Sequence, residues 1–287
     1  MSIDASQVAK KLSLQSVKGY YNPHELIHFP EQIDHNNWFM APELISIFGS
    51  PQYEKLDEEQ KKKLSFYETI NFFSLNIHGE KSLLSGLTQR LYETSDIDIT
   101  DYLHHFIDEE NKHMYFFGTF CEKYAGKIYP DRKFNFPREY AKGEEEFLFF
   151  VKVFVFEEIV DFYNITTAKD ERVIKLTREI NENHHMDEVR HLAFGRVMLR
   201  DFYEKYASKW SQKVLSGVHE YIQSYYTATW KEYYNPDIYV DARIDNHYDL
   251  ASDFFDSPQA KSHRNTASKA SLQFLHKSGI IAEVFEL

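Results

Sequence analysis

Apolar residues recur at alternating steps of three and four along four long stretches of the chain, a spacing that places them on one face of a helix. These stretches cover residues 58–93, 98–124, 143–164 and 170–207, and a break is expected in the last one near residues 181–183. On the first stretch, the apolar face consists of Phe73, Ile77, Leu84, Leu87 and Leu91. Strand signals are weak throughout, so the pattern predicts an all-α fold built on a four-helix bundle.

Capping residues and prolines predict where this bundle begins and what surrounds it. Asp57, with Gln60 three residues later, predicts a capping box at the start of the first long helix. Residues 1–57 contain four prolines and are interpreted as irregular. Residues 208–287 are expected to contain two further helical stretches, near 209–234 and 265–277, with an irregular segment between them. We expect the whole chain, 1–287, to form a single domain around the bundle at 58–207.

Composition and charge exclude several classes of protein. A net charge of -12 argues against a nucleic-acid partner, because such partners are bound by neutralising phosphates. One cysteine, Cys121, permits no internal disulfide and suits a reducing cytosol. The longest apolar run, residues 147–156, is too short to span a bilayer, and residues 1–11 lack the apolar core of a secretion signal. We therefore expect a cytoplasmic protein that binds neither nucleic acid nor a membrane.

Each of the four helical faces carries a glutamate where the pattern calls for an apolar residue. Burying an ionised carboxylate costs several kcal/mol unless it is paired or bound to a metal. A purely structural core has little reason to meet this cost four times, and two divalent cations would balance four carboxylates. The four residues are Glu80, Glu110, Glu157 and Glu188.

Two of these glutamates are followed three residues later by a histidine on the same side of the helix, as Glu110–His113 and Glu188–His191. A lone Glu followed by Glu-x-x-His, occurring twice, is the pattern of ferritin-like di-metal carboxylate proteins. The separations from Glu80 to Glu110 and from Glu157 to Glu188 are nearly equal and suit two antiparallel helix pairs. The sequence thus predicts a di-metal site in a ferritin-like bundle with additional N- and C-terminal helices.

Two positions near the motifs leave alternatives open. His184 lies four residues before Glu188 and on the same helical face, so it is a candidate seventh ligand. Its alternative role is that of a buried histidine that only hydrogen-bonds a ligand. Glu158 competes with Glu157, because both flank the apolar face, and the matched spacing favours Glu157.

At these residues the chain resembles the p-aminobenzoate N-oxygenase (AurF-like) di-iron family. The extra histidine in His-x-x-x-Glu-x-x-His is the distinctive part, and the segment 38–49 also looks like the one preceding the first bundle helix in that family. The resemblance covers residues 38–205. The matching pieces are Gly79-Glu80-Lys81, Glu110-Asn111-Lys112-His113, Glu157, and His184-His185-Met186-Asp187-Glu188-Val189-Arg190-His191.

The resemblance implies a centre of two iron ions, which manganese could replace because both metals accept carboxylate and imidazole. It implies that the centre activates O₂ to oxidise a small-molecule substrate, in the best-known members an arylamine, with electrons from an external donor. A homodimer is expected as the commonest assembly. The implied ligands are Glu80, Glu110, His113, Glu157, His184, Glu188 and His191.

Single features of the sequence argue against two rival functions. A radical generator like the small subunit of ribonucleotide reductase keeps a tyrosine one helical turn after the first Glu-x-x-His, where this chain has Phe117, and the nearby Tyr115 faces away from the apolar stripe. Storage ferritins are shorter and lack the His184 element. A di-iron oxidase or hydroxylase acting on a non-amine substrate, and a non-enzymatic iron-binding protein, remain the alternatives to amine N-oxygenation.

Overall fold

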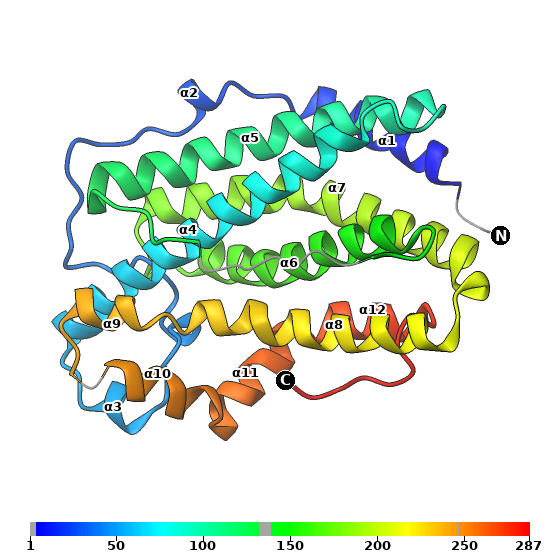
Figure 1. The fold of residues 1–287 in the computed structure, drawn as a ribbon. Coiled ribbons are helices and arrows are strands. Elements are labelled where there is room, and N and C mark those ends of the chain that lie inside the picture. Colours follow the sequence, from blue (N-terminus) through cyan, green and yellow to red (C-terminus); the bar gives the residue numbers. More distant parts are fainter. Residues whose placement is uncertain (1–3, 132–138, 246) are drawn as a thin grey trace.

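The computed structural model describes residues 4–131, 139–245 and 247–287. Four long helices dominate it, and the described residues form no strand, apart from an isolated bridge between Trp38 and Val173. Consecutive long helices pack as two pairs that run in opposite directions (Figure 1). The all-α prediction is confirmed, and the four helices are α4 (Glu58–Arg90), α5 (Ile97–Ala125), α6 (Glu144–Lys169) and α7 (Lys175–Tyr206).

Most predicted helix ends lie within three residues of the observed ones, but α6 ends five residues later than predicted and α7 begins five residues later. Asp57 and Gln60 form the expected capping box at the start of α4. The break expected near residues 181–183 was wrong, because α7 continues through them and Asn181 Nδ2 donates a hydrogen bond to the carbonyl of Thr177 within the helix. This side chain bonds to its own helix, and the backbone has no need to leave the helical path.

The C-terminal third covers one side of the bundle. Helix α8 packs against α6 and α4, and α12 packs against α6 (Figure 1). The segment expected to be irregular after residue 234 instead holds three short helices, two of which begin with a capping Asn or Ser followed by proline. They are too short to display an apolar period. These elements are α8 (Gln212–Tyr233), α9 (Pro236–Ala242), α10 (His247–Phe255), α11 (Pro258–Ala267) and α12 (Lys269–Lys277).

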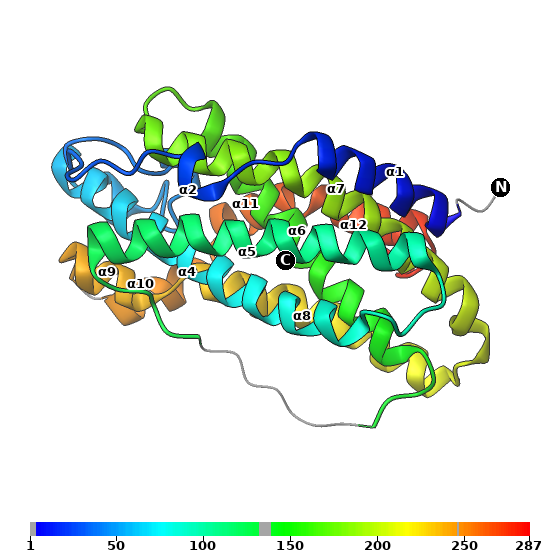
Figure 2. The same cartoon turned by 90° about the horizontal axis from the view of Figure 1, so that it is seen from above.

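The N-terminal segment was wrongly expected to be irregular throughout. It contains α1, which lies along α5 and α7 (Figure 2). Its buried face consists of small or polar residues around Leu12, namely Ala9, Ser13 and Ser16, so the apolar pattern is faint although Asp4 caps the helix. The elements are α1 (Ala5–Lys18), α2 (Pro23–Leu26), η1 (Pro42–Leu44) and α3 (Pro51–Glu54). None of the helices in the described part of the chain combines the length and the apolar character needed to span a bilayer.

Candidate metal centre

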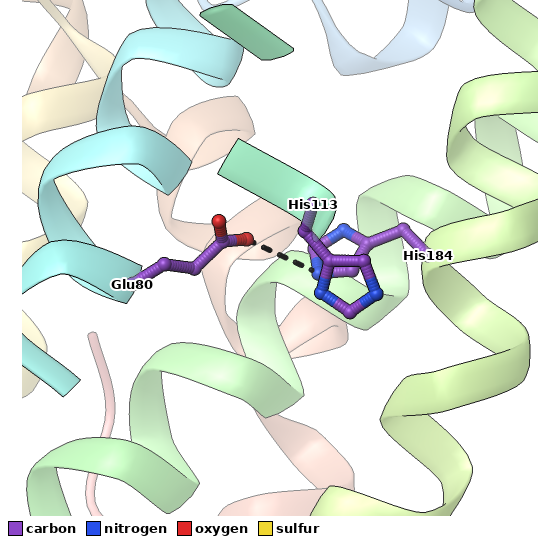
Figure 3. A group of neighbouring side chains, drawn as sticks. All are labelled: Glu80, His113 and His184. Carbon is purple, nitrogen blue, oxygen red and sulfur yellow. Dashed lines mark ion pairs between the residues drawn. The ribbon is translucent and has the colours of Figure 1, made fainter. Parts of the chain in front are cut away.

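All seven residues singled out from the sequence meet inside the bundle, and each has a relative exposure of 1% or less. Six of them supply donor atoms that fall into three groups within 4.8 Å. Nδ1 of His191 joins the cluster at 2.8 Å from Oε1 of Glu110. Figure 3 shows Glu80 directed at His184, with His113 beside them. The three groups are Glu80 with His113 and His184, Glu110 with His113 and Glu188, and Glu157 with His184 and Glu188.

Most donor atoms of this cluster are buried without hydrogen bonds among the described residues. The set includes both carboxylate oxygens of Glu80, Glu110 and Glu157. It also includes Oε2 of Glu188, Nδ1 of His113 and Nε2 of His184. A buried polar atom without a partner is costly, and so many converging on one place are rare in a folded core. Carboxylate oxygens and imidazole nitrogens in this arrangement fit a pair of divalent cations.

Two carboxylates outside the predicted set determine which histidine nitrogen faces the cluster. Nε2 of His113 lies 3.0 Å from Oδ2 of Asp187, and Nε2 of His191 lies 2.9 Å from Oε2 of Glu109. A proton donated from each Nε2 leaves the lone pair of Nδ1 available to a metal. Each supporting carboxylate acts on the other helix. Glu109 of α5 accepts a hydrogen bond from His191 of α7, and Asp187 of α7 accepts one from His113 of α5.

Arg190 links the two supporting carboxylates. Its Nη2 donates to Oε1 of Glu109 at 2.6 Å and to Oδ1 of Asp187. Its Nε donates to Oγ of Ser16 at 3.1 Å, and the hydroxyl of Tyr21 donates to Oδ2 of Asp187 at 2.9 Å. The end of α1 and the residues after it are therefore fastened to the outer side of the cluster.

Sequence reasoning gave no role to Glu109, Asp187, Arg190 or Tyr21. A signal for the first two was present, since an acidic residue directly precedes the glutamate of each Glu-x-x-His motif. Tyr21 lies far from the motifs in sequence, and nothing in the pattern of α1 placed it there.

His184 has the hydrogen-bond partner that a metal ligand needs. Its Nε2 lies 3.0 Å from Oε1 of Glu188 and 3.5 Å from Oε1 of Glu80, while its Nδ1 lies 3.0 Å from the side-chain amide of Asn164. Oδ1 of Asn164 has no partner among the described residues. An amide turned so that Oδ1 accepts the Nδ1 proton satisfies this oxygen and frees Nε2 for coordination.

Burial and neighbouring charges shift the pKa values of the cluster's carboxylates in opposite directions. Burial raises the pKa of Glu80, and the neighbouring Glu110 raises it further. Burial and Glu188 do the same to the pKa of Glu157. Burial alone would also raise the pKa of Glu188, but His191 and His184 outweigh it and lower that pKa well below its ordinary value. The cluster is thus a concentration of like charge that a cation would relieve.

The two competing glutamates of α6 face different surroundings. Glu157 lies in the cluster with its oxygens close to donor atoms of His184 and Glu188. Glu158 forms an ion pair with Arg196 of α7 instead, and burial raises its pKa. The structure therefore brings Glu157 into the cluster and leaves Glu158 outside it.

Aromatic rings close off the cluster. Phe106 stacks on His191 with ring centroids 3.9 Å apart, and the ring of Phe117 lies 5.0 Å from that of His184. Tyr115 is 37% exposed, in line with the expectation that it faces away. Tyr102, which sequence reasoning did not consider, is fully buried, and burial raises the pKa of its hydroxyl.

A cavity of about 1060 Å³ opens between α4, α6 and α8, is also lined by Tyr129, Pro130, Asp131 and Tyr140, and reaches Glu157 of the cluster. Glu157 lies in its wall, together with Gly79, the residue before Glu80. A small molecule in this cavity can therefore approach the cluster from the side of α6.

Two Glu-x-x-His motifs and two lone glutamates, gathered in the core of a four-helix bundle, define a ferritin-like di-metal carboxylate protein. The chain belongs to the P-aminobenzoate N-oxygenase AurF family, whose model matches residues 3–279. The resemblance noted in the sequence is confirmed and extends over nearly the whole chain. Family and site together identify a di-metal oxygenase.

Solved structures share the fold. An R2-like ligand-binding oxidase with aerobically reconstituted metal cofactor after photoconversion is 13% identical, with a TM-score of 0.53 over 95% of this chain and 93% of that chain. Another, with aerobically reconstituted Mn/Fe cofactor (long soak), is 13% identical, with a TM-score of 0.52 over 95% and 92%. At this identity the likeness concerns the fold, and it confirms the ferritin-like prediction. No curated protein matches the sequence significantly.

Proposed function

We propose that the chain is a non-haem di-iron oxygenase that uses O₂ to N-oxygenate an aryl or other amine. The observation that carries this proposal is the convergence of buried carboxylate and imidazole atoms that lack hydrogen bonds among the described residues. The metal ligands in this proposal are Glu80, Glu110, His113, Glu157, His184, Glu188 and His191.

Iron is supported by the donor set and by similar proteins. Carboxylate and imidazole suit both iron and manganese, and the structural neighbours carry a Mn/Fe cofactor. Two ferrous ions bound in the cluster supply the electron transfer to O₂ that no side chain of this chain can provide. The external electron donor that would reduce them again, and the homodimer expected from the commonness of that assembly, belong to the same proposal.

The protein's own side chains orient the imidazole ligands and exclude water from the ligand atoms. Asp187 and Glu109 hold the imidazoles of His113 and His191 so that Nδ1 faces inward. Phe106 and Phe117 cover the histidines from the apolar side and keep water from the ligand atoms. The cavity with Glu157 in its wall offers the substrate a route to the cluster, and the position of the substrate in it would determine which atom is oxidised.

An amine substrate is supported by the family, which is named for N-oxygenation of p-aminobenzoate. Oxidation of a substrate without an amine is the alternative. The deciding experiment is an anaerobic Fe(II) titration of the purified chain, followed by O₂ and p-aminobenzoate with analysis of the products. Two irons per chain and a hydroxylamine, nitroso or nitro product support the proposal. Two irons without oxidised amine reject N-oxygenation, and no bound iron rejects the di-iron centre.

A further inference from the structure

We propose that the cavity between α4, α6 and α8 is the substrate site and that it takes an extended aromatic molecule of more than one ring in line. This inference rests on the proposed oxygenase function, and it goes further by naming the substrate's size and shape. It follows from the volume of the cavity, from its wall and from two glycines of α4 that let two aromatic rings of the wall lie against that helix.

The volume exceeds what one ring needs. Pockets for drug-sized ligands, which carry several rings, span roughly 300–1,000 Å³. The cavity of about 1060 Å³ slightly exceeds the upper end of this range. A single-ring amine bound at the inner end would leave most of the cavity to water and would contact only a small part of the wall.

The wall contains both aromatic rings and hydrogen-bonding groups. Phe149 and Phe156 of α6 supply the apolar rings. Tyr221 and Tyr225 of α8 stack on each other, with centroids 6.1 Å apart and planes 7° apart. Such a surface suits a flat aromatic body with polar substituents along its length. The polar groups in the wall include Asn71, His78, Ser82, Ser224 and Thr229.

Two glycines of α4 let the rings of α6 lie against the helix. A Cβ atom at Gly79 would lie 2.2 Å from Cζ of Phe156, and one at Gly86 would lie 2.1 Å from Cε2 of Phe149. Gly79 and both rings line the cavity. Any side chain at these glycines would push the rings off α4 into the space that the substrate needs. Gly79 and Gly86 therefore keep the rings of Phe156 and Phe149 out of the cavity and so determine how large a molecule it holds.

The cavity can be blocked without touching the metal cluster. Ala228 of α8 lies in the wall and is exposed, so a larger side chain there fills the opening. Ala270 of α12 is an exposed helical alanine that does not line the cavity. Ala228→Trp and Ala270→Trp are thus a matched pair. For the glycines, Gly86→Ala is matched by Gly118→Ala, since a Cβ at Gly118 meets nothing within 4 Å.

The experiment measures binding of para-amino carboxylic acids with one, two and three phenyl rings in line, to the iron-loaded chain without O₂, by calorimetry. We expect affinity to rise at least tenfold from one ring to two. Ala228→Trp and Gly86→Ala should each weaken binding of the longer probes at least tenfold. Ala270→Trp and Gly118→Ala should leave it unchanged, with iron content and melting temperature checked for every variant.

Equal affinity for one and two rings, or long-probe binding that Ala228→Trp leaves intact, would overturn the inference. A failure of the proposed function can be distinguished from a failure of this inference, because the binding measurement does not require turnover. Long probes that bind in the cavity but are not oxidised when O₂ is added reject amine N-oxygenation and leave the size and place of the site standing. Oxidation of p-aminobenzoate that Ala228→Trp does not slow keeps the oxygenase and rejects this cavity as its substrate site.

Discussion

Nε2 of His113 on α5 lies 3.0 Å from Oδ2 of Asp187 on α7, so a carboxylate of one helix sets the orientation of an imidazole on the other. Burial alone would raise the pKa of Asp187, but the hydrogen bond from His113 outweighs it, helped by Arg190, and the pKa lies well below its ordinary value. Asp187 therefore stays ionised and keeps the Nε2 proton of His113 in place, which directs Nδ1 toward Glu110 and Glu188.

Asp187→Asn should weaken iron binding by about 10- to 100-fold, because an amide no longer fixes the charge and proton position of His113. Competition with a chelator of known affinity measures the effect. Asp161→Asn is the matched control, since Asp161 pairs in the same way with His185, which lies outside the cluster. An equal loss of affinity in both variants would show that general destabilisation, and not histidine orientation, is responsible.

Glu110→Ala and His191→Ala should each lose at least one iron per chain and all oxidation activity, because a missing ligand leaves the remaining buried carboxylates uncompensated. Iron content after desalting and product formation from p-aminobenzoate measure the two effects. Full iron occupancy with normal turnover in either variant would contradict the proposed ligand set.

Glu157→Ala and Glu158→Ala separate the two adjacent glutamates of α6. The first should lower iron content, because Glu157 lies in the cluster. The second should keep two irons and lose only the ion pair with Arg196, at a cost to stability of about 1–3 kcal/mol. Iron analysis and urea unfolding of both variants distinguish the roles, and the reverse pattern would assign the ligand to Glu158.

Glu68 of α4, which lies far from the cluster, should make the stability of the folded chain depend on pH. Burial raises its pKa from 4.5 to about 8, and Oε1 accepts a hydrogen bond from the backbone of Ser46 at 3.0 Å. Between these two values the folded chain holds a proton that the unfolded chain has lost. The contribution to stability is therefore complete below pH 4.5 and is lost as the pH rises through 8, by roughly a few kcal/mol.

The test compares urea unfolding of the iron-free wild type with that of Glu68→Gln from pH 5 to pH 8. Glutamine cannot ionise, so the variant should lose less stability over this range than the wild type does. The metal ligands titrate in both proteins and cancel in the comparison. Parallel pH profiles would show that Glu68 titrates normally in the folded chain.

Sequence pattern predicted the long helices well because their apolar faces are large and regular. It also singled out Glu80, Glu110, Glu157 and Glu188, since a glutamate on an apolar face conflicts with its surroundings and so stands out. Helix α1 was missed for the opposite reason, as Ser13 and Ser16 on its buried face resemble a surface. The periodicity of apolar residues reveals where large apolar side chains are buried. It does not reveal buried side chains that are small or polar.

The hydrogen-bond partners of the histidines could not be predicted from the pattern of apolar residues. Glu109 and Arg190 look like ordinary surface charges in sequence, because their importance comes from partners on another helix. Asn164 follows Glu157 by only about two helical turns but carries no signal of its own in the sequence, and its role depends on the ring of His184 meeting it across α6 and α7. Contacts between helices require the packed structure, and helical spacing alone describes only one helix at a time.

The glycines of α4 also align two helices along their length. Gly79 faces Phe156 and Gly86 faces Phe149, so α4 and α6 fit together at two points that are two turns apart. A slide of one turn, about 5.4 Å, would bring both rings against side chains instead of glycines. Gly79 directly precedes Glu80, and Phe156 directly precedes Glu157. The two glycines thus fix the position of α4 along α6, and with it the relative position of the two lone glutamates along the bundle.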